Sequence, residues 1–442
     1  MTTFKKDIFG GAIIAVPGRG LKGEMTVPGD KSISHRAVML GSIASGITEV
    51  TGFLEGEDNL STIGAFRAMG IGIDLQKDSR RVVIRGNGMR GLTEPADVID
   101  AGNSGTTTRL ITGLLSAQPF FSVITGDASL RKRPMKRVVE PLSLMGASIS
   151  GRNNGNNLPL AISGRKLKGI TCKTPIASAQ LKSALMLAGI YAEGETVIEE
   201  PEKSRDHTER MLCLFGADVR TDKNSVSVRS TNELIGCKIE VPGDISSAAF
   251  FVVGAMISPA SALLIRGVGV NLTRTGIIDV LRKMGGTVEV QNERVASGEP
   301  VADLLVKTSR LKGTEVSGAE LLPAIDEFPI ICVAAAFSEG TTRITGAREL
   351  RVKESDRIAA MSEALSRVGV RNAELPDGIV IEGVGSASIK GGKIESHGDH
   401  RIAMSLAMAA LRSDEGVEID GASSVDVSFP GFFDQLKRVR VS

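Results

Sequence analysis

The sequence predicts an α/β protein made of two domains of similar build. At 442 residues and 42% hydrophobic, the chain is long enough for about two to four domains with substantial cores. The run Val27-Pro28-Gly29-Asp30 returns as Val241-Pro242-Gly243-Asp244. The helices that follow are expected to end at Met69-Gly70 and Met284-Gly285, so the two halves share one plan.

A finer repeat of roughly 65 to 80 residues divides each half into three. Each repeat opens with polar residues or glycines that lead into a helix of small apolar residues. These openings are Asp30–Arg36, Asp100–Gly105, Ala177–Gln180, Gly243–Ser247, Ala324–Asp326 and His397–Arg401. We therefore expect a first domain over residues 27–243, and a second over residues 1–26 and 244–442, with three repeats in each.

Each repeat continues through a β-rich segment and closes with a second helix. Five of the closing helices are followed by a glycine, which suits the position just past a helix end: Gly70, Gly146, Gly216, Gly285 and Gly369. The sixth, at residues 435–439, lacks this glycine, as the last repeat of a series often does.

The opening helices are apolar nearly all round, for example over residues 183–189 and 248–255, which predicts burial on every side. The amphipathic closing helices and the strands would then wrap around them. Six helix N-termini become available to face one place, and a cleft between the halves is the natural site. An open solenoid is the alternative, but three repeats per half are few for an open array.

Composition and charge exclude several classes of function. The net charge is +2, aromatic residues make up 3%, and there is no Trp, so a protein that coats nucleic acid is not expected. No apolar run approaches the length of a membrane span. Four scattered cysteines without a Cys-x-x-Cys pair argue against disulfides or zinc and indicate a reducing cytoplasm.

The stretch Pro28–Arg36 predicts an anion-binding site. Pro28 and Gly29 mark a turn, and Asp30 or Ser32 can cap the helix that follows. Lys31 and Arg36 place positive charge where the first backbone N–H groups of that helix have no partner. A capped helix with two solvated cations remains the alternative.

Four further stretches carry more charged and polar groups than turns require. They are Asp127–Pro134, Ser178–Lys182, Asp326-Glu327, and Arg351–Arg357 together with His397–Arg401. A carboxylate that enters a buried helix, such as Asp326, is costly unless it has a partner, and this is one way to make a general base. Lys353 and Arg357 are expected one turn apart on one helix face. The alternatives are a solvated cationic face or a nucleic-acid-binding patch at Asp127–Pro134, and ordinary helix caps and surface ion pairs at the other stretches.

No cofactor is expected. His397, Asp399 and His400 lack a third ligand in a metal-binding context. The glycine-rich motifs that bind nucleotide phosphates are also missing from the sequence.

Taken together, these motifs resemble the EPSP synthase family from about residue 27 to Phe433. They are Gly29–Arg36, Gly102–Thr106, Arg131–Pro134, Ser178–Gln180, Asp326-Glu327, Arg351–Arg357 and Asp399–Arg401. The resemblance implies two inside-out α/β barrel domains, each of three βαβαββ repeats, with the active site in the cleft between them. It also implies a cytoplasmic, monomeric enzyme that transfers the enolpyruvyl group of phosphoenolpyruvate to the 5-hydroxyl of shikimate 3-phosphate.

The resemblance also implies site residues. For shikimate 3-phosphate they are Lys31, Ser32, Arg36, Ser178, Ala179, Gln180, Arg205, Asp326 and Lys353. For phosphoenolpyruvate they are Lys31, Gly105, Arg133, Gln180, Arg357 and Arg401. We expect Asp326 to accept the hydroxyl proton, and Glu354, aided by Lys31, to act at the methylene carbon.

Three positions depart from some members of the family: Val427 stands where a Lys can occur, Ala179 replaces a second Ser, and Leu110 replaces a Pro. The change at Val427 puts one phosphoenolpyruvate contact in doubt. Two other functions are the alternatives. The first is the sister reaction on a UDP-linked amino sugar, which uses a loop Cys that is not found between Arg131 and Pro134. The second is a phosphate-binding module without catalysis, which Asp326 and Glu354 argue against because carboxylates weaken anion binding.

Overall fold

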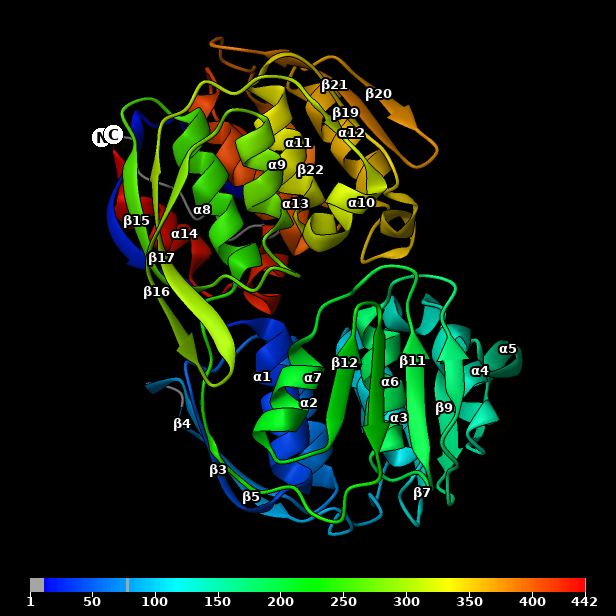
Figure 1. The fold of residues 1–442 in the computed structure, drawn as a ribbon. Helices are drawn as coiled ribbons and strands as arrows, with labels where there is room; N and C mark the ends of the chain where they lie inside the picture. Colours follow the sequence, from blue (N-terminus) through cyan, green and yellow to red (C-terminus); the bar gives the residue numbers. More distant parts are fainter. Residues whose placement is uncertain (1–11, 77–78, 442) are drawn as a thin grey trace. The chain divides into compact units, whose positions relative to one another are not determined.

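The computed structural model describes residues 12–76 and 79–441, which form two compact units (Figure 1). Unit 1 contains the chain up to Pro28, Gly243–Arg294, and the chain from Pro300 onward. Unit 2 contains Gly29–Pro242 and Val295–Glu299. The chain therefore passes from one unit to the other after Pro28, after Pro242, and on both sides of residues 295–299.

The described residues of unit 2 form three sheets of four strands, ordered β14-β3-β5-β4, β6-β7-β9-β8 and β10-β11-β13-β12. In each sheet the first two strands are parallel and the remaining neighbours are antiparallel. The strands are β3 (Ser45–Thr51), β4 (Gly72–Gln76), β5 (Arg81–Asn87), β6 (Ile99–Asp100), β7 (Phe121–Thr125), β8 (Ser148–Gly151), β9 (Asn157–Ser163), β10 (Thr171–Lys173), β11 (Glu195–Glu199), β12 (Val219–Asp222), β13 (Ser225–Arg229) and β14 (Lys238–Glu240).

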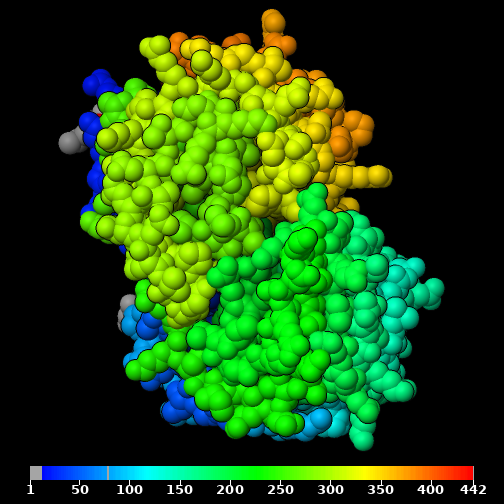
Figure 2. All heavy atoms as spheres, viewed as in Figure 1, coloured from blue at the N-terminus to red at the C-terminus, as the bar shows by residue number. Residues whose placement is uncertain are grey.

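The helices of unit 2 are α1 (Lys31–Ile43), α2 (Glu57–Ala68), α3 (Gly105–Leu115), η2 (Leu130–Lys132), α4 (Lys136–Leu144), α5 (Arg152–Gly155), α6 (Ala179–Gly189) and α7 (His207–Leu214). Nearly every residue of α1 and α3 is buried, as is α6 from Leu181 onward. The apolar side chains of these helices form one core with the sheets and the closing helices. Strands β11 and β12 lie in front of α6 in Figure 1, and green and teal atoms cover that face in Figure 2.

Unit 1 repeats the same plan with sheets ordered β16-β17-β15-β2-β24, β18-β19-β21-β20 and β1-β23-β22. Its strands are β1 (Ile13–Ala15), β2 (Gly20–Thr26), β15 (Ala262–Gly269), β16 (Val288–Ala296), β17 (Glu299–Lys307), β18 (Glu315–Val316), β19 (Glu339–Ile344), β20 (Asn372–Leu375), β21 (Gly378–Val384), β22 (Gly392–Glu395), β23 (Val417–Asp420) and β24 (Arg440–Val441). Its helices are α8 (Ile245–Ile257), α9 (Gly276–Lys283), α10 (Gly318–Leu321), η3 (Leu322–Glu327), α11 (Phe328–Ala336), η4 (Arg348–Val352), α12 (Arg357–Arg367), α13 (His400–Ala409), η5 (Ala410–Arg412), η6 (Ala422–Val427) and α14 (Phe432–Val439).

Two strands are exchanged between the halves of the sequence. β2 precedes α1 in the chain but pairs in parallel with β15 of unit 1. β14 precedes α8 but pairs in parallel with β3 of unit 2. The repeated Val-Pro-Gly-Asp runs lie at these two points, where the chain leaves one unit for the other.

The glycines that follow the closing helices adopt the conformation their positions require. Gly70, Gly146, Gly216, Gly285 and Gly369 all have φ between 85° and 99°, in the left-handed region that ends a helix. The prediction that these five glycines lie just past the ends of helices is therefore confirmed. No sheet formed by the described residues closes on itself, so the units are α/β assemblies of open sheets around buried helices. None of the described helices has the length and apolar character that crossing a membrane requires.

Candidate functional site

The N-terminus of α1 carries the first group of predicted residues. The Asp30 side chain caps the helix by accepting from the Ile33 N–H at 2.9 Å. Lys31 extends to Asp58, with its Nζ 2.6 Å from Oδ2. Lys31 and Ser32 are both half-buried. An ammonium group and the N-terminus of a helix therefore meet at this turn, as an anion site requires.

Arg36 is buried one turn further along α1 and is held rigidly. Its Nε donates to Thr208 Oγ1 at 2.6 Å, and its Nη2 donates to Ser183 Oγ at 2.7 Å. Burial lowers the pKa of the guanidinium to about 10, against the opposing effect of Glu209, and the nearby Arg205 lowers it further. A buried guanidinium favours the binding of an anion beside it, because an opposite charge compensates for the cost of removing it from water.

A second group gathers at the N-terminus of α3. A Cβ built on Gly105 would lie 2.7 Å from Arg109 Nη1 and 3.5 Å from Arg133 Nη1. Arg109 donates to Gln180 Oε1 at 2.8 Å, and the Gln180 amide donates to Thr106 Oγ1 at 3.0 Å. The structure therefore brings Gly105, Arg133 and Gln180 together, although the sequence separates them widely.

Residues Ser178 and Ala179 begin α6. The Ser178 hydroxyl caps the helix by accepting from the Leu181 N–H at 3.4 Å. Both residues are half-buried, as is Arg205, which lies in the segment before α7. The predicted residues of unit 2, apart from Arg36 one turn further along α1, thus lie at the N-terminal ends of its helices or in the segments leading to them.

A chain of hydroxyl groups connects α1 to the N-terminus of α3. His35 Nδ1 lies 2.7 Å from Thr62 Oγ1 on α2, which lies 2.7 Å from Thr107 Oγ1 on α3. Thr107 donates to Ser104, the cap of α3, at 2.7 Å. Burial, followed by the charges of Lys31 and Arg36, lowers the pKa of His35 well below its usual value, so this ring is neutral.

In unit 1 the predicted residues gather around Arg357, whose side chain is buried. Its Nε donates to Asp399 Oδ2 and its Nη2 to Glu354 Oε2, both at 2.8 Å. Its Nη1 lies 3.5 Å from Asp326 Oδ1. Although burial disfavours its charge, Asp399, Glu354 and Asp326 raise the pKa of Arg357. The guanidinium is therefore a fixed cation.

Lys353 and Arg401 complete this group. Lys353 Nζ lies 3.9 Å from Asp326 Oδ1, and partial burial lowers the pKa of Lys353 against the attraction of Asp326. Arg401 Nη1 donates to the backbone carbonyl of Asp326 at 3.0 Å. The Asp326 carboxylate thus lies within 4 Å of the cationic groups of both Lys353 and Arg357.

One local prediction was wrong. Lys353 and Arg357 do not share a helix face, because η4 ends at Val352 and α12 begins at Arg357 with Asp356 as its cap. The Asp356 side chain accepts from the Ala359 N–H, so the helix cannot extend backward through it. Lys353 and Arg357 meet through Asp326 instead.

Two charged residues of these groups were not predicted as site residues. Arg109 links Gly105 to Gln180, and Asp399 holds Arg357. The signal for Arg109 was a single Arg within an otherwise uncharged helix, and the signal for Asp399 was its position as a cap beside Arg401. Val427 ends η6 and is half-buried, so the position where a Lys can occur in this family is apolar here.

The cysteines give no support to a nucleophilic thiol. Cys172 lies in β10 and Cys213 in α7, both away from Arg131–Pro134 in the sequence. Burial raises the pKa of both thiols, so they remain protonated near neutral pH. Among the described residues, no group of three or more His, Cys, Asp or Glu side chains is placed to hold a metal ion.

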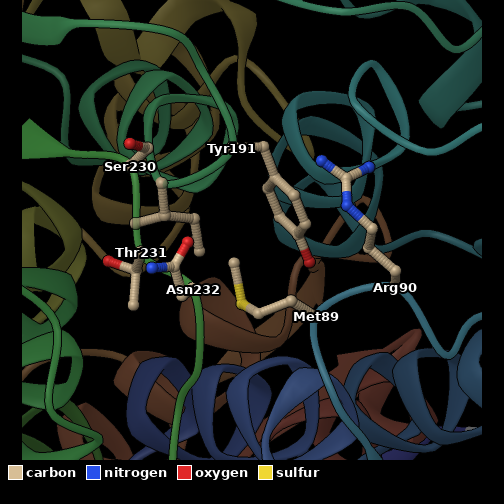
Figure 3. A pocket seen from close by; sticks show the side chains of 7 residues that line it. Met89, Arg90, Tyr191, Ser230, Thr231 and Asn232 are labelled. Carbon is tan, nitrogen blue, oxygen red and sulfur yellow. The ribbon is translucent and has the colours of Figure 1, made fainter.

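A separate pocket of about 270 Å³ lies in unit 2 at the C-terminal end of α6. It is lined by Met89, Arg90, Ile190, Tyr191, Ser230, Thr231 and Asn232 (Figure 3). None of the predicted site residues lines it. Because Ser178 and Gln180 lie at the opposite end of α6, this pocket is distinct from the helix N-termini described above.

Comparisons with known proteins agree over nearly the whole chain. A sequence profile of EPSP synthase (3-phosphoshikimate 1-carboxyvinyltransferase) matches residues 16–436. Curated proteins named 3-phosphoshikimate 1-carboxyvinyltransferase include one from Pelobacter propionicus, 59% identical over 97% of this chain and 99% of its own. A second, from Geobacter metallireducens, is 59% identical over 96% of this chain and 98% of its own.

Solved structures give the same result. A structure of EPSP synthase from Acinetobacter baumannii is 50% identical, with a TM-score of 0.88 over 98% of this chain and 99% of that one. The enolpyruvyl transferase NikO from Streptomyces tendae shares the fold at 15% identity, with a TM-score of 0.79 over 98% of each chain.

Proposed function

The chain belongs to the EPSP synthase family, and on this premise we propose which residues of its two units bind the substrates and transfer protons. The enzyme is a 3-phosphoshikimate 1-carboxyvinyltransferase. It transfers the enolpyruvyl group of phosphoenolpyruvate to the 5-hydroxyl of shikimate 3-phosphate and releases phosphate, a step in aromatic amino acid biosynthesis. We propose that each unit is an inside-out α/β barrel domain of three βαβαββ repeats, with the active site in the cleft between the domains.

In this proposal, the helix N-termini of unit 2 and the Arg357 group of unit 1 together hold two polyanionic substrates. Shikimate 3-phosphate is bound by residues of both units. Unit 2 contributes Lys31, Ser32, Arg36, Ser178, Ala179, Gln180 and Arg205, and unit 1 contributes Asp326 and Lys353. Phosphoenolpyruvate is bound by Lys31, Gly105, Arg133 and Gln180 of unit 2 and by Arg357 and Arg401 of unit 1. The observation that carries this proposal is the gathering of these cations into two compact groups.

The reaction needs two proton transfers, because an alcohol adds across the enol double bond and phosphate then leaves. Asp326 is proposed to accept the proton of the 5-hydroxyl, since neighbouring cations favour its ionised form. Glu354, 2.8 Å from Arg357 and aided by Lys31, is proposed to act at the methylene carbon. Lys31, Lys353 and the arginines stabilise the charge that develops on phosphate and carboxylate oxygens.

The test is an assay of inorganic phosphate with both substrates present. Release that depends on shikimate 3-phosphate and phosphoenolpyruvate together supports the proposal. A UDP-linked amino sugar offered in place of shikimate 3-phosphate tests the sister reaction, and no release is expected, in keeping with the protonated thiols of Cys172 and Cys213. The proposal also includes a cytoplasmic monomer that binds neither nucleic acid nor membrane and that glyphosate inhibits.

A further inference from the structure

A buried ion cluster lies beneath the predicted shikimate 3-phosphate contacts of unit 2. Lys182, on the second turn of α6, extends its Nζ to 2.8 Å from Glu200 Oε2 and 2.7 Å from Glu209 Oε1. The side chains of Lys182, Glu200 and Glu209 are 2%, 3% and 6% exposed. Burying these ions is costly because each must leave water, and the cost is offset only when the ions are closely paired and hydrogen-bonded.

Glu200 joins two segments that carry predicted substrate contacts. Its Oε1 accepts from the backbone N–H of Ser178, the cap of α6, at 3.2 Å. Its Oε2 accepts from the backbone N–H of Ser204 at 3.3 Å, directly before Arg205. One carboxylate therefore sets the positions of both Ser178 and Arg205.

The same cluster supports Arg36 from the other side. Glu209 follows Thr208 on the first turn of α7, and Thr208 accepts from Arg36 at 2.6 Å. Ser183, which follows Lys182, also accepts from Arg36, and its hydroxyl lies 2.6 Å from that of Thr208. Lys182 thus ties together α6, α7 and the segment between them through its two carboxylates.

We infer that Glu200 and Lys182 are positioning residues for the recognition of shikimate 3-phosphate: their ion pair fixes Ser178, Arg205 and Arg36 in one arrangement before the substrate binds. This inference rests on the proposed function. The side chains of both residues are almost fully buried, so we assign them an indirect role, through backbone and side-chain groups that are proposed to contact the substrate. A site that holds these groups in place avoids the cost of ordering them during binding.

The test measures binding and kinetics separately for two variants. In Glu200→Ala, the Ser178 and Ser204 N–H groups lose their acceptor and Lys182 loses one partner. We expect the Kd for shikimate 3-phosphate, measured by calorimetry, and its KM to rise by about tenfold or more. The KM for phosphoenolpyruvate should change by less than about twofold, because Gly105 and Arg133 lie on other segments. Gln180 is the one proposed phosphoenolpyruvate contact on α6, and Arg109 and Thr106 hold its side chain independently of Glu200. Glu200→Gln keeps one acceptor oxygen at similar volume, and should show a smaller rise of the same kind.

Asp303→Ala is the matched control. Asp303 is a buried carboxylate of unit 1 that also accepts a backbone N–H, from Gly267 at 2.8 Å, and pairs with Arg266. It should lower stability without changing the ratio of the two KM values. If Glu200→Ala does not fold, by circular dichroism, Glu200→Gln decides the question.

The outcomes separate the inference from the function on which it rests. If the wild-type enzyme does not bind shikimate 3-phosphate, the proposed function fails. If the wild-type enzyme binds it and a folded Glu200 variant binds it equally well, the inference alone is overturned. An equal rise in both KM values would also overturn it, because that result indicates general damage rather than positioning of one substrate.

Discussion

At the scale of single residues, the proposed chemistry depends on carboxylates held among cations. Asp326 lies 3.5 Å from Arg357 and 3.9 Å from Lys353, and Glu354 lies 2.8 Å from Arg357. We predict that Asp326→Ala and Glu354→Gln each lower kcat by about 10²- to 10⁴-fold, the usual contribution of general acid–base catalysis. The measurement is steady-state phosphate release at saturating substrates.

Glu363→Gln provides the control for that prediction. Glu363 lies on α12 in an exposed pair with Arg367 at 2.8 Å, and such pairs contribute little to stability. Its kcat should match the wild-type value. Near-normal turnover in either Asp326→Ala or Glu354→Gln would show that another group transfers the corresponding proton.

Gly105 gives a second prediction at this scale, which concerns the size of the ligand. A methyl group at this position would lie 2.7 Å from Arg109 Nη1, so the end of Arg109 must move, and Arg109 holds Gln180. Glyphosate is longer than phosphoenolpyruvate, so the added methyl group should weaken the binding of glyphosate more. We predict that Gly105→Ala raises the glyphosate inhibition constant by about tenfold more than the KM for phosphoenolpyruvate, the usual effect of one methyl group in a pocket.

Gly64→Ala serves as the comparison for Gly105→Ala. A Cβ at Gly64, within α2, meets nothing within 4 Å, so both constants should stay at their wild-type values. Equal rises in the two constants of Gly105→Ala would contradict the size argument. A wild-type enzyme that is already indifferent to glyphosate would contradict it as well.

At the scale of elements, the start of α13 couples a helix cap to the ion group. Asp399 accepts from the Arg401 N–H at 2.9 Å and from Arg357 at 2.8 Å. Burial alone would raise the pKa of its carboxyl, but Arg357 holds the pKa below its usual range. We predict that Asp399→Asn, which can still cap the helix, lowers the free energy of unfolding by about 3 kcal/mol near neutral pH, because it breaks a buried pair.

The pH dependence of this loss follows from the lowered pKa. A carboxyl with a folded-state pKa below its unfolded value, about 3.9, stabilises the fold fully above that pH. Its contribution is lost as the pH falls through the folded-state pKa, so the difference between wild type and Asp399→Asn in urea unfolding should shrink below about pH 4. Asp356→Asn is the control, since Asp356 also caps a helix but pairs with Arg351 in a more exposed setting. Its loss should stay within about 1 kcal/mol.

The elements themselves were largely predictable from the sequence. The opening helices, their caps at Asp30 and Ser178, and the glycines after the closing helices follow from local rules of capping and burial. The break in the helix between Lys353 and Arg357 could not be predicted, because the same spacing of charges fits either one helix or two short helices separated by a cap. Contacts such as Lys182 to Glu200 also escaped prediction, because the packing of α6 against the segment after β11 selects the partner.

At the scale of the whole molecule, the internal repeat predicted two similar halves. In the structure, β2 pairs with β15 and β14 pairs with β3, so each of the two repeated Val-Pro-Gly-Asp runs follows a strand that belongs to the other half. The completion of the last sheet was not predictable in the same way. β23 takes β1 as its antiparallel neighbour, and these strands lie at opposite ends of the sequence. Pairing at such separation is decided by which edge remains open after the local strands have paired, and neither hydrophobic pattern nor turn chemistry specifies it.

The proposed sharing of shikimate 3-phosphate by both units predicts a change of conformation on binding. Its contacts are expected from Lys31 and Arg36 of one unit and from Asp326 and Lys353 of the other, so the bound ligand favours arrangements in which both sets reach it. We predict that the radius of gyration from small-angle X-ray scattering falls when shikimate 3-phosphate is added to saturation. Lys353→Met removes one of these contacts in unit 1 and should weaken the decrease at equal occupancy, whereas Gly64→Ala should leave it intact. An unchanged radius of gyration in wild-type protein shown by calorimetry to be saturated would mean that the ligand does not draw the units together.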